Sequence, residues 1–348
     1  MAVSSESTMV TARAPGRVNL IGDHTDYTGG LCFPIAIDRA VEISGRRDRA
    51  LGEIRLTSAG LPDAVIALDV GEPAAVQPEW ARYVAGVIGQ LRPAEGFNGV
   101  VRSDLPAGSG LSSSAALEVA VALAMGADRA DPIGLARMCQ AAEHAARGVP
   151  TGLLDQLASI CGVEGSGLRL DCRSLEVVPI PLPPAEVARW LVVWAGARSL
   201  ADSGYADRVV ELATAEAAIG PLRDATADDL TELDDPTIRA RARHVLSENR
   251  RVDDFAAAIA AGDLAVAGAL MSESHRSLSG DFACSTASID ELCQSLSATP
   301  YVHGARMTGG GWGGCVVALT EPGALDASAY DSAWWVQPSA GAEVRTGV

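Results

Sequence analysis

Lysine is missing from this sequence of 348 residues, so all 27 positions counted as lysine or arginine are arginines. A Walker A loop needs its lysine to reach the terminal phosphates of a nucleotide, and a Schiff base needs a lysine amine. Both chemistries are therefore excluded. Any phosphate must be bound by backbone amides, hydroxyl groups, magnesium or arginine.

Sequence patterns for metal sites and disulfides are also missing. The seven cysteines include no CxxC pair, and the five histidines form neither HxxxH nor HExxH. A structural zinc site and a disulfide framework are therefore disfavoured. The wide cysteine spacing, and an N-terminal MAVSSESTMV without a basic or apolar signal segment, predict a cytoplasmic protein.

Long apolar runs and positive charge are scarce. The richest apolar run, AALEVAVALAMGA at 115–127, includes Glu118 and is too short to span a bilayer, so it predicts a core helix. The net charge of −17 disfavours a nucleic acid or an anionic membrane as partner. We expect a small-molecule ligand.

The clearest break in the chain is PIPLPP at 179–184, with four prolines in six positions. Neither a helix nor a central strand is expected to continue through it, which predicts two domains, 1–183 and 184–348. Strand and helix patterns interleave without a regular βαβ period, which indicates an α+β fold. The expected strands are 17–22, 31–37, 97–103, 189–195 and 314–320, and the expected helices are 113–129, 205–219, 237–261, 264–278 and 288–297.

A glycine- and serine-rich loop opens the predicted helix after residue 112. In LPAGSGLSSSAALEVAVALA at 105–124, Gly108 and Gly110 let the backbone turn, and the serines at 112–114 lie where a helix needs its N-cap. Free amides at a helix N-terminus attract anions, which predicts a phosphate site without lysine. The alternative is an ordinary Gly-Ser turn that caps a core helix.

A second glycine run precedes the last predicted strand. RMTGGGWGGCVVAL at 306–319 has five glycines in six positions, as expected where backbone approaches a ligand closely. Two such loops, one in each half of the chain, predict a ligand between the halves. The alternative reading of the second loop is a flexible hairpin.

Polar side chains gather in RVNLIGDHTDYTGG at 17–30. After the strand pattern, Asp23, His24 and Asp26 lie together before Gly29 and Gly30. Carboxylates and imidazole accept and donate hydrogen bonds to vicinal hydroxyls, so the cluster suits a polyol. The alternative is an Asx-rich hairpin with a solvated charge pair. A metal site is less favoured because only one histidine is present.

Two further acids occur in EHAARGVPTGLLDQLASICG. Asp155 begins a helical run after VPTG, and Glu143 lies twelve residues earlier on a helix that ends near Gly148. A helix N-terminus favours a carboxylate, and a carboxylate oxygen suits magnesium. Read alone, the pattern around either acid favours a helix-surface or capping residue.

Taken together, these motifs resemble the galactokinase family of GHMP small-molecule kinases. The matching segments are GRVNLIGDHTDYTGG, LPAGSGLSSSAALEVA, AEHAARGVPTGLLDQLAS and GARMTGGGWGGC, in an order that spans roughly 14–320. The resemblance implies a two-domain fold, with an N-terminal domain like ribosomal protein S5 domain 2 and a ferredoxin-like C-terminal domain. The active site is then expected in the cleft between them.

The resemblance also implies residue roles. Asp155 and Arg17 match the catalytic pair, Ser114 and Glu143 match the magnesium ligands, and Trp80 matches a position near adenine. Asp23 replaces a common glutamate, and Trp312 replaces a common phenylalanine. The sugar contacts match Asp23, His24, Asp26, Gly152 and Tyr205, and the loop around the ATP phosphates matches Pro106, Gly108, Ser109, Gly110, Leu111, Ser112, Ser113, Ser114 and Ala115.

The implied reaction moves the γ-phosphoryl group of ATP to the C1 hydroxyl of galactose, with Mg²⁺ as cofactor. Asp155 would take the sugar proton, and Arg17 would stabilise negative charge beside it. We expect a monomer with galactose and Mg-ATP as its partners. Two alternatives remain open at this point: a related sugar-1-kinase for N-acetylgalactosamine or arabinose, and a non-catalytic sensor of galactose and ATP.

Overall fold

The computed structural model describes residues 8–106, 108–148, 151–196 and 204–347. Its first half is built on a six-stranded sheet in the order β13-β1-β3-β6-β4-β5. Only the β4–β6 pair is parallel. The strands are β1 (Thr8–Asn19), β3 (Pro34–Asp48), β4 (Glu53–Ser58), β5 (Leu61–Ala67), β6 (Gly96–Ser103) and β13 (Glu343–Gly347).

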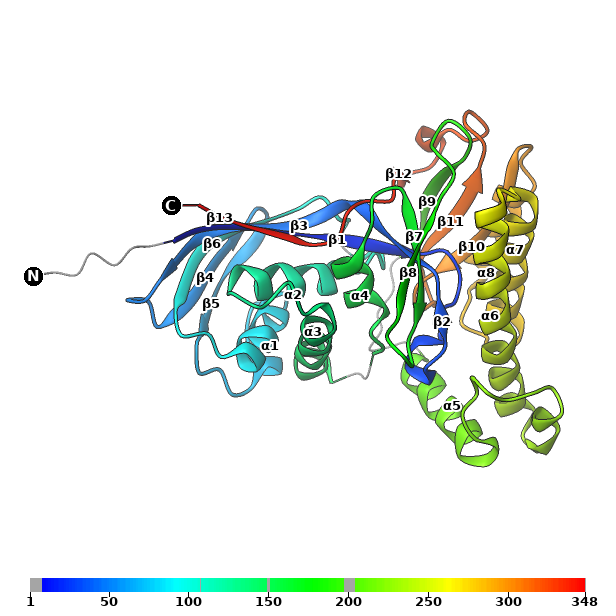
Figure 1. The fold of residues 1–348 in the computed structure, drawn as a ribbon, viewed down its shortest axis with the longest axis horizontal. Helices are drawn as coiled ribbons and strands as arrows, with labels where there is room; N and C mark the ends of the chain where they lie inside the picture. The colour runs from blue at the N-terminus through cyan, green and yellow to red at the C-terminus, as the bar shows by residue number, and fades with distance from the viewer. Residues whose placement is uncertain (1–7, 107, 149–150, 197–203, 348) are drawn as a thin grey trace, which may run out of the picture.

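Four helices lie against one face of this sheet (Figure 1). Buried and partly buried residues alternate along the start of β1, where Val10, Ala12 and Ala14 belong to the core. This alternation is what a sheet covered on one face requires. The helices are α1 (Ala81–Leu91), α2 (Ser113–Ala124), α3 (Pro132–Arg147) and α4 (Leu154–Cys161).

Helix α2 is the core helix that the apolar run predicts, and every residue from position 115 to position 124 is buried. The predicted end at residue 129 is wrong. The helix stops at Ala124 because Gly126 adopts a left-handed conformation with φ of 98°, and Arg47 Nε donates to the Ala124 carbonyl oxygen at 2.7 Å.

The second half contains a four-stranded antiparallel sheet in the order β10-β11-β9-β12. Helices α7 and α8 pack on it, and α6 packs on α7 (Figure 1). The predicted helices here agree with the structure within two residues at each end. The elements are β9 (Arg189–Gly196), α5 (Tyr205–Ile219), α6 (Pro236–Ala261), α7 (Leu264–Gly280), α8 (Ala287–Ser297), β10 (Val302–Thr308), β11 (Gly314–Thr320) and β12 (Ala333–Val336).

A small third sheet, in the order β2-β7-β8, belongs to the first half and contacts α6 of the second. The proline-rich segment does not end all pairing, because Pro179 and Pro181 lie in β8, the edge strand of this sheet, where a missing amide is tolerated. Its strands are β2 (Leu31–Cys32), β7 (Ser166–Asp171) and β8 (Val177–Pro181), and the short 3-10 helices are η1 (Asp26–Thr28), η2 (Pro73–Ala75), η3 (Asp229–Glu232) and η4 (Ala327–Ala329).

The C-terminal strand does not stay with the second half. Strand β13 pairs with β1 along five residue pairs, from Met9 with Gly347 to Arg13 with Glu343. The split at 183/184 stays a prediction for the bulk of the chain, but a domain of 184–348 does not account for β13. The chain crosses back to the first sheet after β12.

Candidate active site

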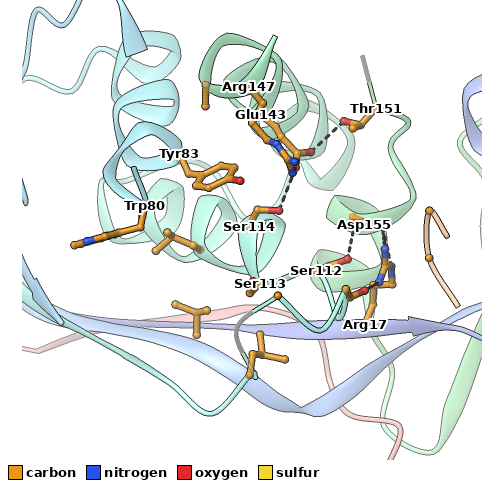
Figure 2. A pocket seen from close by; sticks show the side chains of 18 of the residues that line it. Arg17, Trp80, Tyr83, Ser112, Ser113, Ser114, Glu143, Arg147, Thr151 and Asp155 are labelled. Atoms are coloured by element: carbon orange, nitrogen blue, oxygen red, sulfur yellow. Dashed lines mark hydrogen bonds and ion pairs between the residues drawn. The ribbon is translucent and has the colours of Figure 1, made fainter. Parts of the chain in front are cut away.

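A cavity of about 910 Å³ lies where the two halves meet. Asp23, Ser113 and Asp155 from the first half line it, together with Tyr205 and Gly309 from the second. Figure 2 shows how the side chains of its first-half wall are arranged, with Trp80 at one end and Arg17 at the other. The two glycine-rich loops therefore border one space, as the sequence predicts.

Arg17 and Asp155 form an ion pair in this cavity. Arg17 Nε donates to Asp155 Oδ1 at 2.7 Å, and the second nitrogen, NH2, is 2.6 Å from the same oxygen. Arg17 NH1 also donates to the carbonyl oxygen of Gly110 at 2.7 Å. Asp155 lies in the first turn of α4, as predicted. The pair connects the strand β1, the phosphate loop and α4.

Ser112 occupies the N-cap position of α2, but its side chain does not cap the helix. Its φ of 59° places the backbone in the left-handed region, and its hydroxyl donates to Asp155 Oδ2. The expectation that this serine supplies the cap is therefore wrong, because its left-handed backbone is not the extended conformation of an N-cap and its hydroxyl is turned toward Asp155. The first amides of α2 are left free of a serine cap.

Glu143 and Ser114 meet at the centre of the cavity wall. Ser114 Oγ donates to Glu143 Oε1 at 3.1 Å, while Thr151 Oγ1 and Gln156 Nε2 donate to Glu143 Oε2 at 3.0 and 3.1 Å. Figure 2 shows Ser114, Glu143 and Thr151 joined in this way. Sequence reasoning missed Gln156, because nothing in its local pattern separates it from a core glutamine.

Gln156 also faces Glu118, the one acid in the apolar run of α2. Gln156 Nε2 is 3.5 Å from Glu118 Oε2, and the Glu118 side chain is fully buried. Burial, and then the charge of Glu143, raise the pKa of Glu118 well above its usual range. Its buried position behind the cavity wall thus favours the protonated form of Glu118.

Asp23 is only 5% exposed and is held from the second half of the chain. Arg306 NH2 lies 2.6 Å from Asp23 Oδ2, and the amide of Gly309 donates to Asp23 Oδ1 at 2.9 Å. Arg306 itself is fully buried. The alternative of a solvated charge pair at this turn is therefore wrong.

Three residues of α6 support the same turn, and sequence reasoning gave none of them a role. Glu248 Oε1 accepts from the amide of Gly22 at 2.9 Å, Asn249 Oδ1 accepts from the amide of Leu31 at 2.7 Å, and His244 Nε2 lies 3.1 Å from the Asp23 carbonyl oxygen.

Glu248 is charged although it is buried. Burial raises the pKa of Glu248, but His244, Arg251 and Arg306 together lower it to about 2. Arg251 NH2 lies 2.8 Å from its Oε2 atom, and Arg306 NH2 lies 3.8 Å from Oε1. The turn thus rests on a buried network of paired charges rather than on solvent.

Asp26 packs directly against Gly152. A Cβ atom on Gly152 would lie 1.8 Å from Asp26 Oδ2, so only glycine fits there. Burial, followed by the charges of Asp155 and Asp23, raises the pKa of Asp26 to about 7. Three acids, at 23, 26 and 155, therefore share one end of the cavity.

His24 and Tyr205 complete this end. His24 Nδ1 shares a hydrogen bond of 3.0 Å with the Tyr27 hydroxyl, and its ring lies 4.4 Å from Phe282 and 5.6 Å from Tyr205, centroid to centroid. Tyr205 begins α5 and brings a phenol from the second half. The segment ARSLADSGYADR at 197–208 also resembles the galactokinase family, and its residues 197–203 lie outside the described residues.

The predicted nucleotide residues fall into two groups. Trp80 lines the far end of the cavity, and its Nε1 donates to the Pro62 carbonyl oxygen at 3.0 Å. The other residues that line it are Gly108, Gly110, Ser112, Ser113 and Ser114. The residues of the loop that do not line the described cavity are Pro106, Ser109, Leu111 and Ala115. Two hydrogen bonds shape the loop here. Ser109 Oγ donates to the Pro106 carbonyl oxygen, and the Leu111 carbonyl oxygen accepts from the Arg17 amide.

The second glycine loop is folded tightly rather than flexibly. A Cβ atom on Gly311 would lie 2.3 Å from the Cys284 carbonyl oxygen, which accepts from the Trp312 amide at 2.7 Å. Gly309 and Gly310 face the cavity. The close packing of Gly311 and Trp312 against Cys284 contradicts the alternative of a flexible hairpin.

Comparison with known proteins identifies the family. A galactokinase in Roseiflexus is 42% identical over 342 residues, which cover 93% of this chain and 86% of the relative. The chain belongs to the galactokinase family. The human galactokinase is 41% identical over 333 residues, covering 89% and 83% of the two chains. Family models match the galactokinase galactose-binding signature at 2–47, the GHMP kinase N-terminal domain at 82–163 and the GHMP kinase C-terminal domain at 255–333.

Solved structures confirm the predicted fold class. The Lactococcus lactis galactokinase complexed with galactose superposes with a TM-score of 0.87 at 29% identity, covering 96% of this chain and 95% of that one. The Methanococcus jannaschii mevalonate kinase shares the fold with a TM-score of 0.69 at 18% identity, over 97% of this chain and 100% of that one. The two-domain GHMP kinase fold is thus shown.

No helix within the described ranges is long and apolar enough to cross a membrane. In the same ranges, no group of three or more His, Cys, Asp or Glu side chains could hold a metal ion.

Proposed function

We propose that this protein transfers the γ-phosphoryl group of ATP to the C1 hydroxyl of galactose. The observation that carries the proposal is the Arg17–Asp155 pair, which lies in one cavity with the acids Asp23 and Asp26 and the serine-lined N-terminus of α2. Membership of the galactokinase family supports the same reaction. The sugar end then holds the acceptor, and the serine end holds the nucleotide.

Asp155 is the proposed proton acceptor for the attacking hydroxyl. Oδ1 is bonded to Arg17 and Oδ2 to Ser112, so its carboxylate plane is fixed before a substrate arrives. Such alignment is where phosphoryl transfer gains most of its rate. The Arg17 guanidinium, with one nitrogen on Gly110, is placed to offset charge on the moving phosphoryl group.

The residues present fit a magnesium ion. Mg²⁺ in phosphoryl-transfer sites takes one or two protein oxygens and completes its shell with phosphate and water. Ser114 Oγ and Glu143 Oε1, 3.1 Å apart on the cavity wall, are oxygen donors of this kind. We propose that they hold the ion, which would neutralise phosphate charge when bound.

The sugar contacts remain proposals for Asp23, His24, Asp26, Gly152 and Tyr205. Among them the acids accept hydrogen bonds from hydroxyl groups, and Gly152 leaves room for Asp26. The nucleotide is proposed to lie along 106–115 with its base near Trp80. That the protein is a monomer, and that it is cytoplasmic, stay predictions. All seven cysteines are free, which agrees with a reducing location.

The test is to incubate the protein with Mg-ATP and a panel of galactose, N-acetylgalactosamine, arabinose and glucose, and to measure ADP release. We expect turnover with galactose and a phosphate on C1, which phosphorus NMR identifies. Preferential turnover of another sugar would identify a related kinase. Binding of galactose and ATP without any sugar phosphate would identify a sensor and overturn the proposal.

A further inference from the structure

The cavity is rich in negative charge, although its proposed nucleotide is also negative. Its lining includes five carboxylate residues and three arginines. The carboxylates are Asp23, Asp26, Glu79, Glu143 and Asp155, and the arginines are Arg17, Arg82 and Arg147. In a chain without lysine, these arginines are the fixed cations that can offset the charge of a phosphate tail.

Two of the three arginines are already engaged elsewhere. Arg17 gives its nitrogens to Asp155 and Gly110. Arg82, on α1 two residues after Trp80, donates from Nε to the Val76 carbonyl oxygen at 3.2 Å. Arg82 therefore belongs to the end of the cavity where the base is expected.

Arg147 differs from both. It ends α3, its side chain is 24% exposed, and within the described ranges its one ion pair, of 4.0 Å, joins NH1 to Glu143 Oε1. That carboxylate already accepts hydrogen bonds from Ser114, Thr151 and Gln156. Within the described residues, the guanidinium of Arg147 thus donates no hydrogen bond, and it lines the cavity wall.

The position of Arg147 also matches a phosphate tail. Figure 2 shows it beside Glu143, on the same part of the wall as Ser114 and Tyr83, between Trp80 and the Arg17–Asp155 pair. Stabilisation of the C-terminus of α3 is an alternative role. That role does not require a side chain on the cavity wall, where Arg147 lies, and the 4.0 Å ion pair with Glu143 is too long to be a strong structural contact.

We propose that Arg147 binds the phosphate tail of Mg-ATP, as the cation that replaces the missing lysine. The inference rests on the proposed function, because it places the phosphates at Ser114 and Glu143. A guanidinium can donate two parallel hydrogen bonds to a phosphate, which suits this role. The contact would place a positive charge, at the C-terminal end of α3, beside phosphates that the uncharged amides and hydroxyls of α2 also bind.

The experiment measures binding without turnover. ATP, ADP and adenosine, each with magnesium and without sugar, are titrated into the wild type, Arg147→Gln and Arg147→Lys by calorimetry. For Arg147→Gln we expect ATP and ADP to bind at least about tenfold more weakly, as for loss of a charged hydrogen bond. Adenosine binding should not change, and Arg147→Lys should restore part of the ATP affinity.

Arg137→Gln is the matched control, because Arg137 is exposed on the same helix and lies outside the cavity wall. Its ATP affinity should equal that of the wild type. The inference is overturned if Arg147→Gln binds ATP within twofold of the wild type, or if adenosine affinity falls in parallel. A wild type that binds no ATP would overturn the proposed function as well.

Discussion

The two ends of the cavity are built differently. At the sugar end, the turn with Asp23 is held by Arg306, Glu248 and His244, all from the second half of the chain. At the phosphate end, Ser114 and Glu143 are positioned by residues of the first half alone, from α2 to α4. One end joins the two halves, and the other belongs to one of them.

Because of this difference, substitutions at the two ends should have different effects on folding and on binding. The sugar end rests on buried charges that lose much when one partner is removed. The phosphate end presents helix amides and hydroxyls to the cavity, where solvent or a nucleotide can satisfy them. Substitutions at the sugar end should therefore affect folding as well as binding, whereas those at the phosphate end should affect binding first.

The largest effect is expected at Asp155, where the two ends meet. Asp155→Asn keeps the shape but removes the proton acceptor, so kcat should fall by about a hundredfold to ten-thousandfold. ADP release with saturating galactose and Mg-ATP measures this. ATP binding by calorimetry should remain within a few fold of the wild type. Retention of more than about half the turnover would contradict the assignment of Asp155.

Arg306→Met tests whether the buried charges at the sugar end stabilise the fold. Because this change leaves Asp23 and Glu248 buried without their cation, the free energy of unfolding should fall by about 3–5 kcal/mol. Urea denaturation followed by tryptophan fluorescence measures the loss. A loss below about 1 kcal/mol would show that the buried network does not support the turn.

Arg49→Met is the control for that experiment, since Arg49 pairs with Glu95 at the surface and its side chain is 85% exposed. Its stability should stay close to that of the wild type. If Arg306→Met does not fold, Arg306→Lys keeps the charge. Arg306→Lys should then fold, with an unfolding midpoint below that of the wild type.

A steric change at Gly152 should weaken the binding of sugar much more than the binding of ATP. In Gly152→Ala the new methyl group overlaps Asp26 Oδ2 and displaces that carboxylate. The KM for galactose should rise on the order of tenfold to a hundredfold, with the KM for ATP nearly unchanged. Gly52→Ala, at a position with open space around its Cβ, is the control. Equal rises in both KM values would indicate a general loss of structure.

The smallest effect concerns the pH dependence of stability. The pKa of Asp26 is raised from 3.8 to about 7, so the folded state favours the protonated form. Its contribution to stability is complete below about pH 4 and is lost as the pH rises through about 7. Asp26→Asn mimics the protonated form, and should gain stability relative to the wild type between pH 5 and pH 8.

Urea denaturation of both proteins at the two pH values tests this. Asp254→Asn, an exposed site on α6, should show no such change with pH. A stability difference between wild type and Asp26→Asn that is equal at pH 5 and pH 8 would contradict a pKa near 7 for Asp26.

Much of the fold follows from local patterns. Helix α5 begins and ends where its periodicity predicts, and β11 matches its apolar run residue for residue. The failures lie at the two ends of α2. Gly126 ends the helix early through its own left-handed conformation, which is a local signal, whereas Ser112 does not cap it because its hydroxyl bonds to Asp155, which is distant in sequence.

The site shows the same limit. Motif residues at 17, 23, 26 and 155 could be placed in one cleft from the sequence, and the structure brings them together there, while their roles stay predictions. The supporting residues could not be found, because a buried ion pair carries no local signal. Glu248 and the Gly22 amide that it accepts from are 226 positions apart, and Arg306 resembles any strand arginine.

The return of β13 to β1 has a consequence for synthesis on the ribosome. Strand β1 emerges among the first residues, but its outer neighbour is made only after the whole second half. Until then β1 presents an unpaired edge that a chaperone or another nascent chain can bind. Premature termination shortly before residue 343 would leave that edge permanently open and favour aggregation.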